Sequence, residues 1–516
     1  MYPPSIARDR PDALAYVMAS SGRSLTYDQL DRRSNQLAHR WRQEGIRSGD
    51  TVVIAMENNI EWPVVVAAGM RSGLYVTPVN WHLKSDELAS LIAESKPAVV
   101  VTSSALAATV SAALDAATHR AHRLSVDEHT DGFHHLGAEV AGLPETPIED
   151  ELLGARVLFS GGTTGRPKVF RQALLGIHPQ DAPQRHGGLV EKLAIDSSAV
   201  MLSPAPNYHA APFTFQLITL AAGGTIVCME KFDADAALDA VRKYDVTHSQ
   251  WVPTMLVRLL QTCGKERFSA PSHRVAVTSG APCSADIKAE IDQWWGPILH
   301  EYYGASEGYG HTYISPLEAR SHPGSVGRPL GSTSVHITDP DGVELGPKEI
   351  GTVWFAPNAT QSYTNASDAS DVSDASARKQ MGDIGYLDDD GFLYLVGRAG
   401  FMIISGGVNI YPDEIEATLI AHPDVLDAAV IGVPHPEFGE QVKAIVELRA
   451  PAGSDAVVEA DLIDYCRSKL AHYKAPKIVE FTERLPRLPT GKLDKRTLRD
   501  TFTRVDTLSI DIGGQP

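Results

Sequence analysis

One short stretch of this sequence has the spacing of a catalytic serine. "YYGASEGYG" (302–310) contains Gly304-x-Ser306-x-Gly308, the pattern around a serine-hydrolase nucleophile, and the acidic Glu307 lies beside the serine. A hydrolase needs a strand, a sharp turn and then a helix at this point. "ILHEYYG" predicts the strand, but "YGHTYISP" after it does not predict a helix. The serine and the glutamate are therefore both candidates, and the rest of the chain must decide between them.

A glycine-rich loop has the composition of a phosphate site. "FSGGTTGRPKV" (159–169) follows a predicted strand and combines glycines, threonines and Lys168. Glycines allow backbone N–H groups to approach an anion closely, and the hydroxyls and the lysine add donors and charge. The loop is not a Walker A motif, because Gly165 is followed by Arg166 and Pro167 instead of Lys-Ser or Lys-Thr. An ordinary turn with a solvated lysine remains the alternative.

Two further features are weak when each is taken alone. "GDIGYLDDDGFLYLVGR" (382–398) predicts a hairpin that turns at residues 389–391 and brings Asp383 near Arg398 at its open end. Such a carboxylate can accept both hydroxyls of a ribose, and the arginine can orient a sugar or a phosphate. A salt bridge that only closes the hairpin is the alternative. Lys492, in "LPTGKLDK", taken alone is a solvated lysine.

Length, charge and cysteine content narrow the class of protein. The chain has 516 residues, 43% of them hydrophobic, which predicts at least two domains. Its formal net charge of -18 argues against nucleic acid or an anionic membrane as a partner. Four cysteines without a CxxC pair predict core thiols in a reducing compartment and no cysteine metal site. We find neither a signal-like amino terminus nor an apolar run of membrane-spanning length, and so expect a soluble, cytoplasmic protein.

The hydrophobic pattern predicts an α/β fold. Helix-like and β-branched segments alternate from residue 26 to about 303, which favours mostly parallel sheets. Shorter strands and tight turns from about 330 predict a small β-rich subdomain, and 361–379, rich in Ser, Asp and Ala, predicts a mobile surface loop. A compact α+β unit follows. We expect a large N-terminal domain over 1–397 and a small C-terminal domain over 398–516.

The order of these motifs resembles that of a known superfamily. "FSGGTTGRPK", "YYGASEG", "MGDIGYLDDDGFLYLVGR", "ISGGVNIYPDEIE" and "LPTGK" together resemble the adenylate-forming enzymes, which include acyl-CoA synthetases, nonribosomal peptide adenylation domains and firefly-type luciferases. The resemblance covers nearly the whole chain. "ISGGVNIYPDEIE" and "GVPHPEFGEQVKAIV" are more similar to the acyl-CoA synthetases than to the peptide-synthetase domains.

The resemblance implies an ATP-dependent acid:CoA ligase. Such an enzyme joins a carboxylate to the α-phosphorus of ATP, releases pyrophosphate, and passes the acyl group to coenzyme A. The resemblance implies that Ser306 contacts the α-phosphate and that Glu307 holds Mg²⁺. It also implies that Asp383 and Arg398 bind the ribose, and that Lys492 bridges the acid and the α-phosphate. The small domain then rotates for thioester formation. The remaining nucleotide and coenzyme A contacts that it implies are Ser160, Gly161, Gly162, Thr163, Thr164, Gly165, Lys168, Gly280, Ala281, Pro282, Tyr302, Tyr303, Gly304, Gly406 and Gly407.

The acid site is harder to predict. His209 in "PNYHAAP" matches the aromatic gate of acyl-CoA synthetases, and Tyr208, Phe213, Trp251 and Gly304 are candidates for the acyl pocket. For each of these residues alone, core packing is the first interpretation. Their character favours an apolar acid, whether fatty, aryl or steroid-like.

Three positions depart from the family pattern. Val169 stands where a glycine usually extends the phosphate loop, and Met381 replaces a threonine before Gly-Asp. Gly400 and Phe401 occupy the hinge, where many relatives have a charged pair such as Lys-Asp. The trigger of domain rotation and the efficiency of the thioester step therefore stay open.

Other functions stay open at this point. The acyl group could pass to a carrier protein or an amine instead of coenzyme A. The chain could also be a serine hydrolase that uses Ser306, or a catalytically inactive relative that only binds. The expected partners are a small carboxylic acid, ATP and coenzyme A, and the expected assembly is a monomer or a homodimer.

Overall fold

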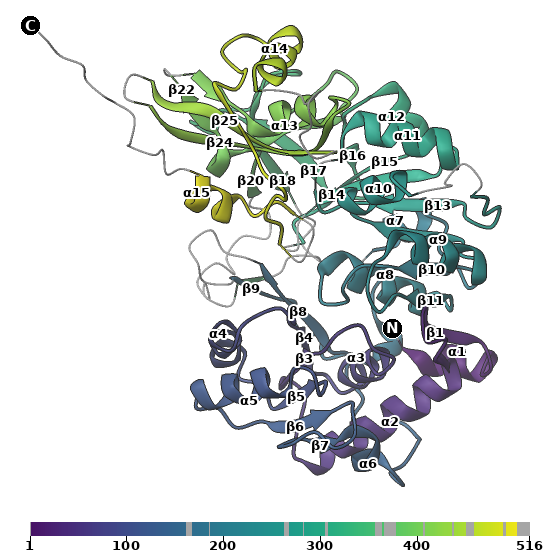
Figure 1. Ribbon diagram of the computed structural model, residues 1–516. Coiled ribbons are helices and arrows are strands. Elements are labelled where there is room, and N and C mark those ends of the chain that lie inside the picture. Colours follow the sequence, from purple (N-terminus) through teal and green to yellow (C-terminus); the bar gives the residue numbers. More distant parts are fainter. Residues whose placement is uncertain are drawn as a thin grey trace, which may run out of the picture.

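The computed structural model describes most of the chain. The described residues are 2–160, 168–184, 186–262, 268–281, 283–304, 308–356, 364–365, 378–405, 408–435, 438–449, 459–488 and 492–502. Two large sheets lie in the lower and right-hand parts of Figure 1, and the green and yellow C-terminal unit lies at the top. This mixed α/β architecture, with a large N-terminal part and a small C-terminal unit, confirms the predicted fold class.

The first large sheet contains the strand that precedes Ser306. Its order is β16 (Arg328–Pro329), β15 (His311–Ile314), β14 (Leu299–Gly304), β13 (Val275–Thr278), β12 (His248–Trp251), β10 (Val200–Ser203), β11 (Thr225–Cys228), β1 (Leu14–Met18) and β2 (Ser24–Thr26). Strands β1 and β10 to β14 pair in parallel, whereas β15 runs antiparallel to β14. The element that follows Ser306 is thus a strand, which contradicts the helix that a serine-hydrolase nucleophile requires.

The second large sheet leads into the glycine-rich loop. Its order is β19 (Thr364–Asn365), β9 (Lys168–Arg171), β8 (Ala155–Ser160), β4 (Tyr75–Pro78), β3 (Thr51–Ala55), β5 (Val99–Thr102), β6 (His122–Ser125) and β7 (His134–His135). β8 and β9 form an antiparallel pair in which Ser160 faces Lys168. The glycine-rich loop therefore joins two hydrogen-bonded strands. Of the predicted mobile loop, residues 366–377 and 361–363 lie outside the described residues.

Helices cover both large sheets. They are α1 (Pro3–Asp9), α2 (Tyr27–Gln43), α3 (Trp62–Arg71), α4 (Ser85–Ser95), α5 (Ala107–Ala116), α6 (Leu136–Val140), α7 (Gly187–Lys192), α8 (Ala210–Ala221), α9 (Ala234–Lys243), α10 (Pro253–Leu260), α11 (Ala285–Trp295), α12 (Pro316–Ser321) and the 3-10 turn Pro179–Asp181. The capping box predicted at Thr26 and Gln29 is present.

Two apolar helices form the centre of the large domain. Every residue of α3 is buried, and Trp62 of α3 packs edge-on against Phe213 of α8 with ring centroids 5.6 Å apart. A helix that is apolar on all sides belongs in an interior. Both helices contribute to one core cluster that also contains residues of β3, β4 and β8 and of β1, β10 and β13, so this core joins the two large sheets.

Two smaller sheets complete the fold. The small sheet has the order β17 (Ser334–Thr338), β18 (Gly351–Ala356), β20 (Lys379–Leu387) and β21 (Leu393–Arg398). The C-terminal sheet contains β23 (Val408–Ile410), β22 (Ile403–Ser405), β25 (Gly439–Leu448), β24 (Val425–His435) and β26 (Ile478–Phe481), and it packs with α13 (Pro412–Ile420), α14 (Glu459–Lys469) and α15 (Lys495–Phe502). The 3-10 turn Ala399–Phe401 connects the two sheets.

Residues 325–328 join the first large sheet to the small sheet. Gly327 forms an isolated bridge with Leu393, and the Val326 backbone N–H donates to the Leu393 carbonyl at 2.9 Å. Gly327 has φ +94°, and a Cβ there would lie 2.1 Å from the carbonyl oxygen of Tyr313. Only glycine allows this close approach of two backbones.

We expect Gly327→Ala to lower the free energy of unfolding by more than about 3 kcal/mol, because the methyl group meets backbone that cannot move aside. Gly324→Ala is the matched control. Gly324 also has a left-handed φ, +85°, but open space surrounds it, so the expected cost is about 1 kcal/mol. Urea denaturation of the two variants measures the difference. Equal losses would contradict the proposed contact.

Candidate functional site

The site segments predicted from sequence lie at one edge of the first large sheet. In a parallel sheet the carboxyl ends of the strands share an edge, and ligands bind there. His209 follows β10, Trp251 ends β12, Gly280 and Ala281 follow β13, and Gly304 ends β14. Gly280 has φ +86°, which suits a sharp turn directly after a strand. The topology thus brings these separate motifs to one edge.

Several predicted site residues lie outside the described residues. They are Gly161, Gly162, Thr163, Thr164, Gly165, Pro282, Ser306, Glu307, Gly406 and Gly407. For Ser160 and Lys168 the structure places the backbone, at the ends of β8 and β9. The proposed phosphate, metal and pantetheine contacts of these residues therefore remain predictions.

Asp383 and Arg398 meet as the predicted hairpin requires. They are directly paired residues of β20 and β21, and Arg398 Nε donates to Asp383 Oδ1 at 2.8 Å. Tyr303 of β14 donates its hydroxyl to the other oxygen, Oδ2, at 2.5 Å. Asp383 is only 5% exposed. A buried carboxylate is thus held from both sides and keeps lone pairs for further donors.

Tyr302 and Tyr303 point to opposite faces of the sheet. Successive strand residues alternate in this way. Tyr303 packs with Phe355 of the small sheet, whereas Tyr302 lies near Phe215 of α8, with ring centroids 5.9 Å apart. Strand β14 therefore separates a side that faces Asp383 from a side that faces α8.

The predicted gate residue lies in an aromatic cluster. His209 precedes the first residue of α8, and its ring lies 4.0 Å from that of Tyr208, which in turn lies 4.9 Å from Trp81. Among the described residues, neither the buried Nε2 of His209 nor the buried hydroxyl of Tyr208 has a hydrogen-bond partner. A buried polar atom without a partner calls for an explanation, and a bound ligand or water is one of them.

The C-terminal lysine reaches this cluster. Burial, followed by the charges of Lys492 and His82, lowers the pKa of His209 to about 3. Lys492 is exposed and sits on a turn in which the Leu488 N–H donates to the Lys492 carbonyl at 2.8 Å. The C-terminal unit is thus placed with its lysine close enough to His209 to affect the histidine's titration.

The contacts of Trp251 are those of a core residue. It is fully buried, its Nε1 donates to Ser249 Oγ at 2.6 Å, and its ring packs against Phe232 and Trp295. It belongs to a different core cluster from Phe213. We therefore leave Trp251 out of the proposed acyl pocket.

Sequence reasoning missed two residues beside Phe213 and Gly304. Arg156 of β8 is 5% exposed, its Nη1 donates to Thr214 Oγ1 at 2.5 Å, and its guanidinium lies 5.6 Å from the ring centroid of Phe213. His311 is paired directly with Gly304, where a Cβ would lie 2.5 Å from the histidine ring. A charged residue inside the apolar run "ARVLF" was the available signal for Arg156.

The predicted hinge residue contacts the last helix. Lys495 Nζ and Arg499 Cζ of α15 lie 5.5 and 5.6 Å from the ring centroid of Phe401. Such cation–π contacts are attractive. Phe401 is therefore held by the C-terminal unit, although a charged pair usually stands at this point in the family.

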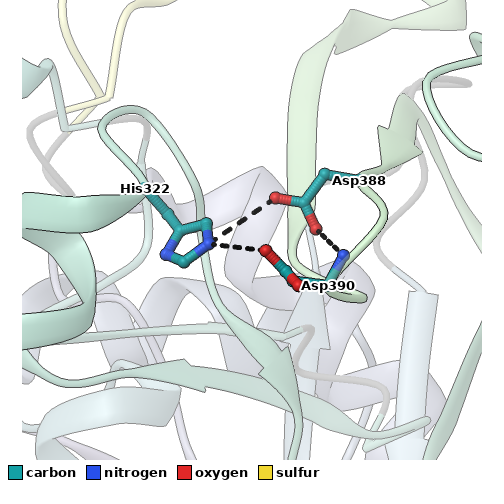
Figure 2. A group of neighbouring side chains, drawn as sticks. All are labelled: His322, Asp388 and Asp390. Atoms are coloured by element: carbon teal, nitrogen blue, oxygen red, sulfur yellow. Dashed lines mark hydrogen bonds and ion pairs between the residues drawn. The ribbon is translucent and has the colours of Figure 1, made fainter.

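Another group of titratable residues lies at the far end of the same hairpin. Figure 2 shows His322, after α12, facing Asp388 and Asp390 in the turn between β20 and β21, at 3.9 and 3.5 Å. Asp388 already accepts from the backbone N–H groups of Asp390 and Phe392 and from the Tyr394 hydroxyl. The His322 ring also stacks on Phe392. These contacts tie α12 to the hairpin turn.

Comparison with known proteins identifies the family. The profile of the AMP-binding enzyme family matches residues 5–363, and that of the AMP-binding enzyme C-terminal domain matches residues 414–492. The chain is a member of the AMP-binding enzyme family. It therefore belongs to the adenylate-forming superfamily, which confirms the resemblance seen in its motifs.

Relatives of this family member cover nearly its whole length. A feruloyl-CoA synthase of Amycolatopsis sp is 32% identical over 96% of this chain and 98% of its own. Among solved structures, ATP-bound MatB from Rhodopseudomonas palustris has a TM-score of 0.84 at 29% identity, over 98% of this chain and 99% of its own. The amide bond synthetase McbA from Marinactinospora thermotolerans has a TM-score of 0.81 at 26% identity, over 97% and 99%.

Two solved forms of MatB match this chain to different degrees. MatB without ATP has a TM-score of 0.73 against this chain, compared with 0.84 for the ATP-bound form of the same protein. Within the described ranges, no helix is both long and apolar enough to cross a bilayer.

The buried histidines predict acid sensitivity. Burial lowers the pKa of His209 to about 3 and those of His273, His300 and His311 to about 4, below the ordinary value of 6.5. Between these values the four imidazoles bind more protons in the unfolded chain than in the folded protein. Their contribution to the free energy of unfolding should therefore fall as the pH drops from about 6.5 toward 4.

Denaturation at pH 7 and pH 5 tests this expectation. His300→Asn should show a smaller loss between the two pH values than the unchanged protein, since one neutral buried imidazole is gone. His129→Asn is the control, because the His129 side chain is 95% exposed. Identical losses in both variants would contradict the explanation.

Proposed function

We propose that the chain activates a carboxylic acid with an apolar body as an acyl adenylate, releases pyrophosphate, and transfers the acyl group to coenzyme A. Its membership of the family and the names of its relatives make it an AMP-forming acid–CoA ligase. The nature of the acid and the roles of individual residues are the proposal.

The convergence of Lys492, His209 and Asp383 on one sheet edge carries this proposal. A lysine near the entrance to the acid site can hold the substrate carboxylate and the α-phosphate together and can stabilise the charge that develops between them. The Asp383 carboxylate, buried beside Tyr303, suits the two hydroxyls of a ribose. The lysine as a donor and the carboxylate as an acceptor thus match the two ends of an acyl adenylate.

The remaining roles follow the family pattern. We assign the β- and γ-phosphates to the loop from Ser160 to Lys168, and the adenine to Gly280, Ala281, Pro282 and Tyr303. Tyr302, which the family pattern also places at the adenine, lies near Phe215 of α8, and we leave it out of this assignment. Ser306 is assigned to the α-phosphate and Glu307 to Mg²⁺, whose preferred ligands are oxygen atoms. Arg398 assists Asp383, and Gly406 and Gly407 line the path of pantetheine.

The apolar character of the acid rests on the surroundings of Phe213. Phe213 is fully buried, and Tyr208 is 8% exposed beside Trp81. An acyl chain or ring that packs between these side chains would lose contact with water, which favours binding by about 25 cal/mol per Å² of apolar surface buried. His209 controls the entrance.

The small domain begins at residue 398 in this proposal. Between the half-reactions it rotates about Gly400 and Phe401, carries Lys492 away, and brings residues 405–409 to the site. The contacts of Phe401 with Lys495 and Arg499 keep its ring with the C-terminal unit during the rotation. An enzyme that consumes ATP and coenzyme A would work in the cytoplasm.

A different acceptor is the second candidate. The likeness to an amide bond synthetase supports transfer of the acyl group to an amine instead of coenzyme A. Both alternatives share the adenylation half-reaction and the residues assigned to it. They differ only in the second step, so the product of that step distinguishes them.

A pyrophosphate-release screen over fatty, aryl and steroid-like acids, with ATP and Mg²⁺, tests the activation step. We expect release with at least one acid, and an acyl-CoA product when coenzyme A is added. Activation followed by an amide or a carrier-bound thioester, without acyl-CoA, would favour the second candidate. Absence of pyrophosphate release with every acid would contradict both and would favour a protein that only binds.

Lys492→Ala should abolish adenylation, because the charge that neutralises the transition state is lost, and should spare thioester formation from a supplied acyl adenylate. The expected loss of the first half-reaction is at least about 100-fold. Lys477→Ala, which removes an exposed lysine of the same domain, is the control and should leave both half-reactions unchanged. Equal losses of both half-reactions in Lys492→Ala would contradict this role.

A further inference from the structure

The side of β14 that faces α8 contains charged and polar groups that an apolar acid does not need. Arg156 lies on β8, a strand with neighbours on both sides in the second large sheet. Strands in such positions are usually continuous apolar runs, and the other residues of "ARVLF" follow that rule. A buried guanidinium needs polar or charged groups around it, and Arg156 has Thr214 among its partners.

Arg156 lies beside the proposed acyl pocket. Its guanidinium contacts Phe213 and Thr214 of α8. Its positive charge also lowers the pKa of His311 and opposes the rise that burial causes in the pKa of Tyr302. Arg156 therefore lies within electrostatic range of the two aromatic residues of β14 and β15 that face α8 and border Gly304.

The position along α8 separates Arg156 from the reacting carboxylate. His209, near Lys492, directly precedes α8, and Thr214 lies five residues further on. A helix rises 1.5 Å per residue, so Arg156 contacts α8 about 7.5 Å further along the helix than His209. Lys492 and Arg156 therefore act on different parts of α8, the first near its start and the second more than a turn beyond it.

We propose that the acid carries a second carboxylate, which binds Arg156 at the inner end of the acyl pocket while the first is activated near Lys492. The inference rests on the proposed function and specifies its substrate as a dicarboxylic acid with an apolar middle. The planar fork of arginine suits a carboxylate, since two parallel N–H groups can donate to its two oxygens. The neutral imidazole of His311 and the Tyr302 hydroxyl are further donors at that end.

Pyrophosphate release with matched acids tests the proposal. The probes are α,ω-dicarboxylic acids of four to ten carbons and the monomethyl ester of each, which keeps the length and removes one charge. We expect kcat/KM to be about 10- to 100-fold higher for the best diacid than for its monoester, the value of one charged hydrogen-bond pair. Equal or greater activity with the monoesters would overturn the proposal.

Variants separate recognition from structural support. Arg156→Met keeps the aliphatic stem and should reduce the diacid preference to about one, whereas Arg156→Lys should restore part of it. Arg274→Met, which removes an exposed arginine before β13, is the charge-matched control and should keep the full preference. A purely structural role would lower the activity with both acids by the same factor and leave their ratio unchanged, which would overturn the proposal. If Arg156→Met does not fold, the ratio of kcat/KM for the diacid to that for its monoester is compared between Arg156→Lys and the unchanged protein.

The same measurements distinguish failure of the second-carboxylate proposal from failure of the proposed ligase function. Activity confined to monocarboxylic acids would contradict the second carboxylate and leave the ligase function standing. Absence of pyrophosphate release with mono- and dicarboxylic acids alike would instead contradict the proposed function itself.

Discussion

The hydrogen bond between Tyr303 and Asp383 is the contact on which the arrangement of the site depends. It links the end of β14 in the first large sheet to the hairpin of the small sheet, at 2.5 Å. Residues 325–328 support the same junction from the other side, because Gly327 lies against the backbone of Tyr313 and bridges to Leu393. Asp383 is thereby fixed next to the edge where the parallel strands end. Without this junction, the proposed ribose and acid sites would lie on separate units.

The alternating side-chain directions along β14 then divide the candidate site into two sides. Tyr303 faces Asp383, and Tyr302 faces α8, since neighbouring strand residues point to opposite sides. The same alternation pairs Gly304 with His311, where any side chain at 304 would meet the imidazole. One strand thus separates the proposed nucleotide side from the proposed acid side, and the last residue of that strand is Gly304.

The features predicted correctly from the sequence are those that depend on residues close together in the chain. The capping box at Thr26, the alternation of helices and strands, and the pairing of Asp383 with Arg398 all depend on residues close together in the chain. The orientation of Trp251 was not predictable in this way, because it depends on Phe232 and Trp295 from other elements. Arg156 was missed for the same reason, since its neighbour Thr214 is 58 residues away in the chain. Long-range packing decides which face of a strand borders a pocket.

The titration of His209 reflects both parts of the protein. Burial among the residues of the large N-terminal part, followed by the charges of Lys492 and His82, lowers the pKa of His209 to about 3. The histidine is therefore neutral, and a neutral imidazole does not repel the nearby lysine. No described residue hydrogen-bonds to its buried Nε2. In the proposed function, the aromatic side chains around His209 thus surround both the entrance for the acid and the position of the activating lysine, so a change in their packing should affect both.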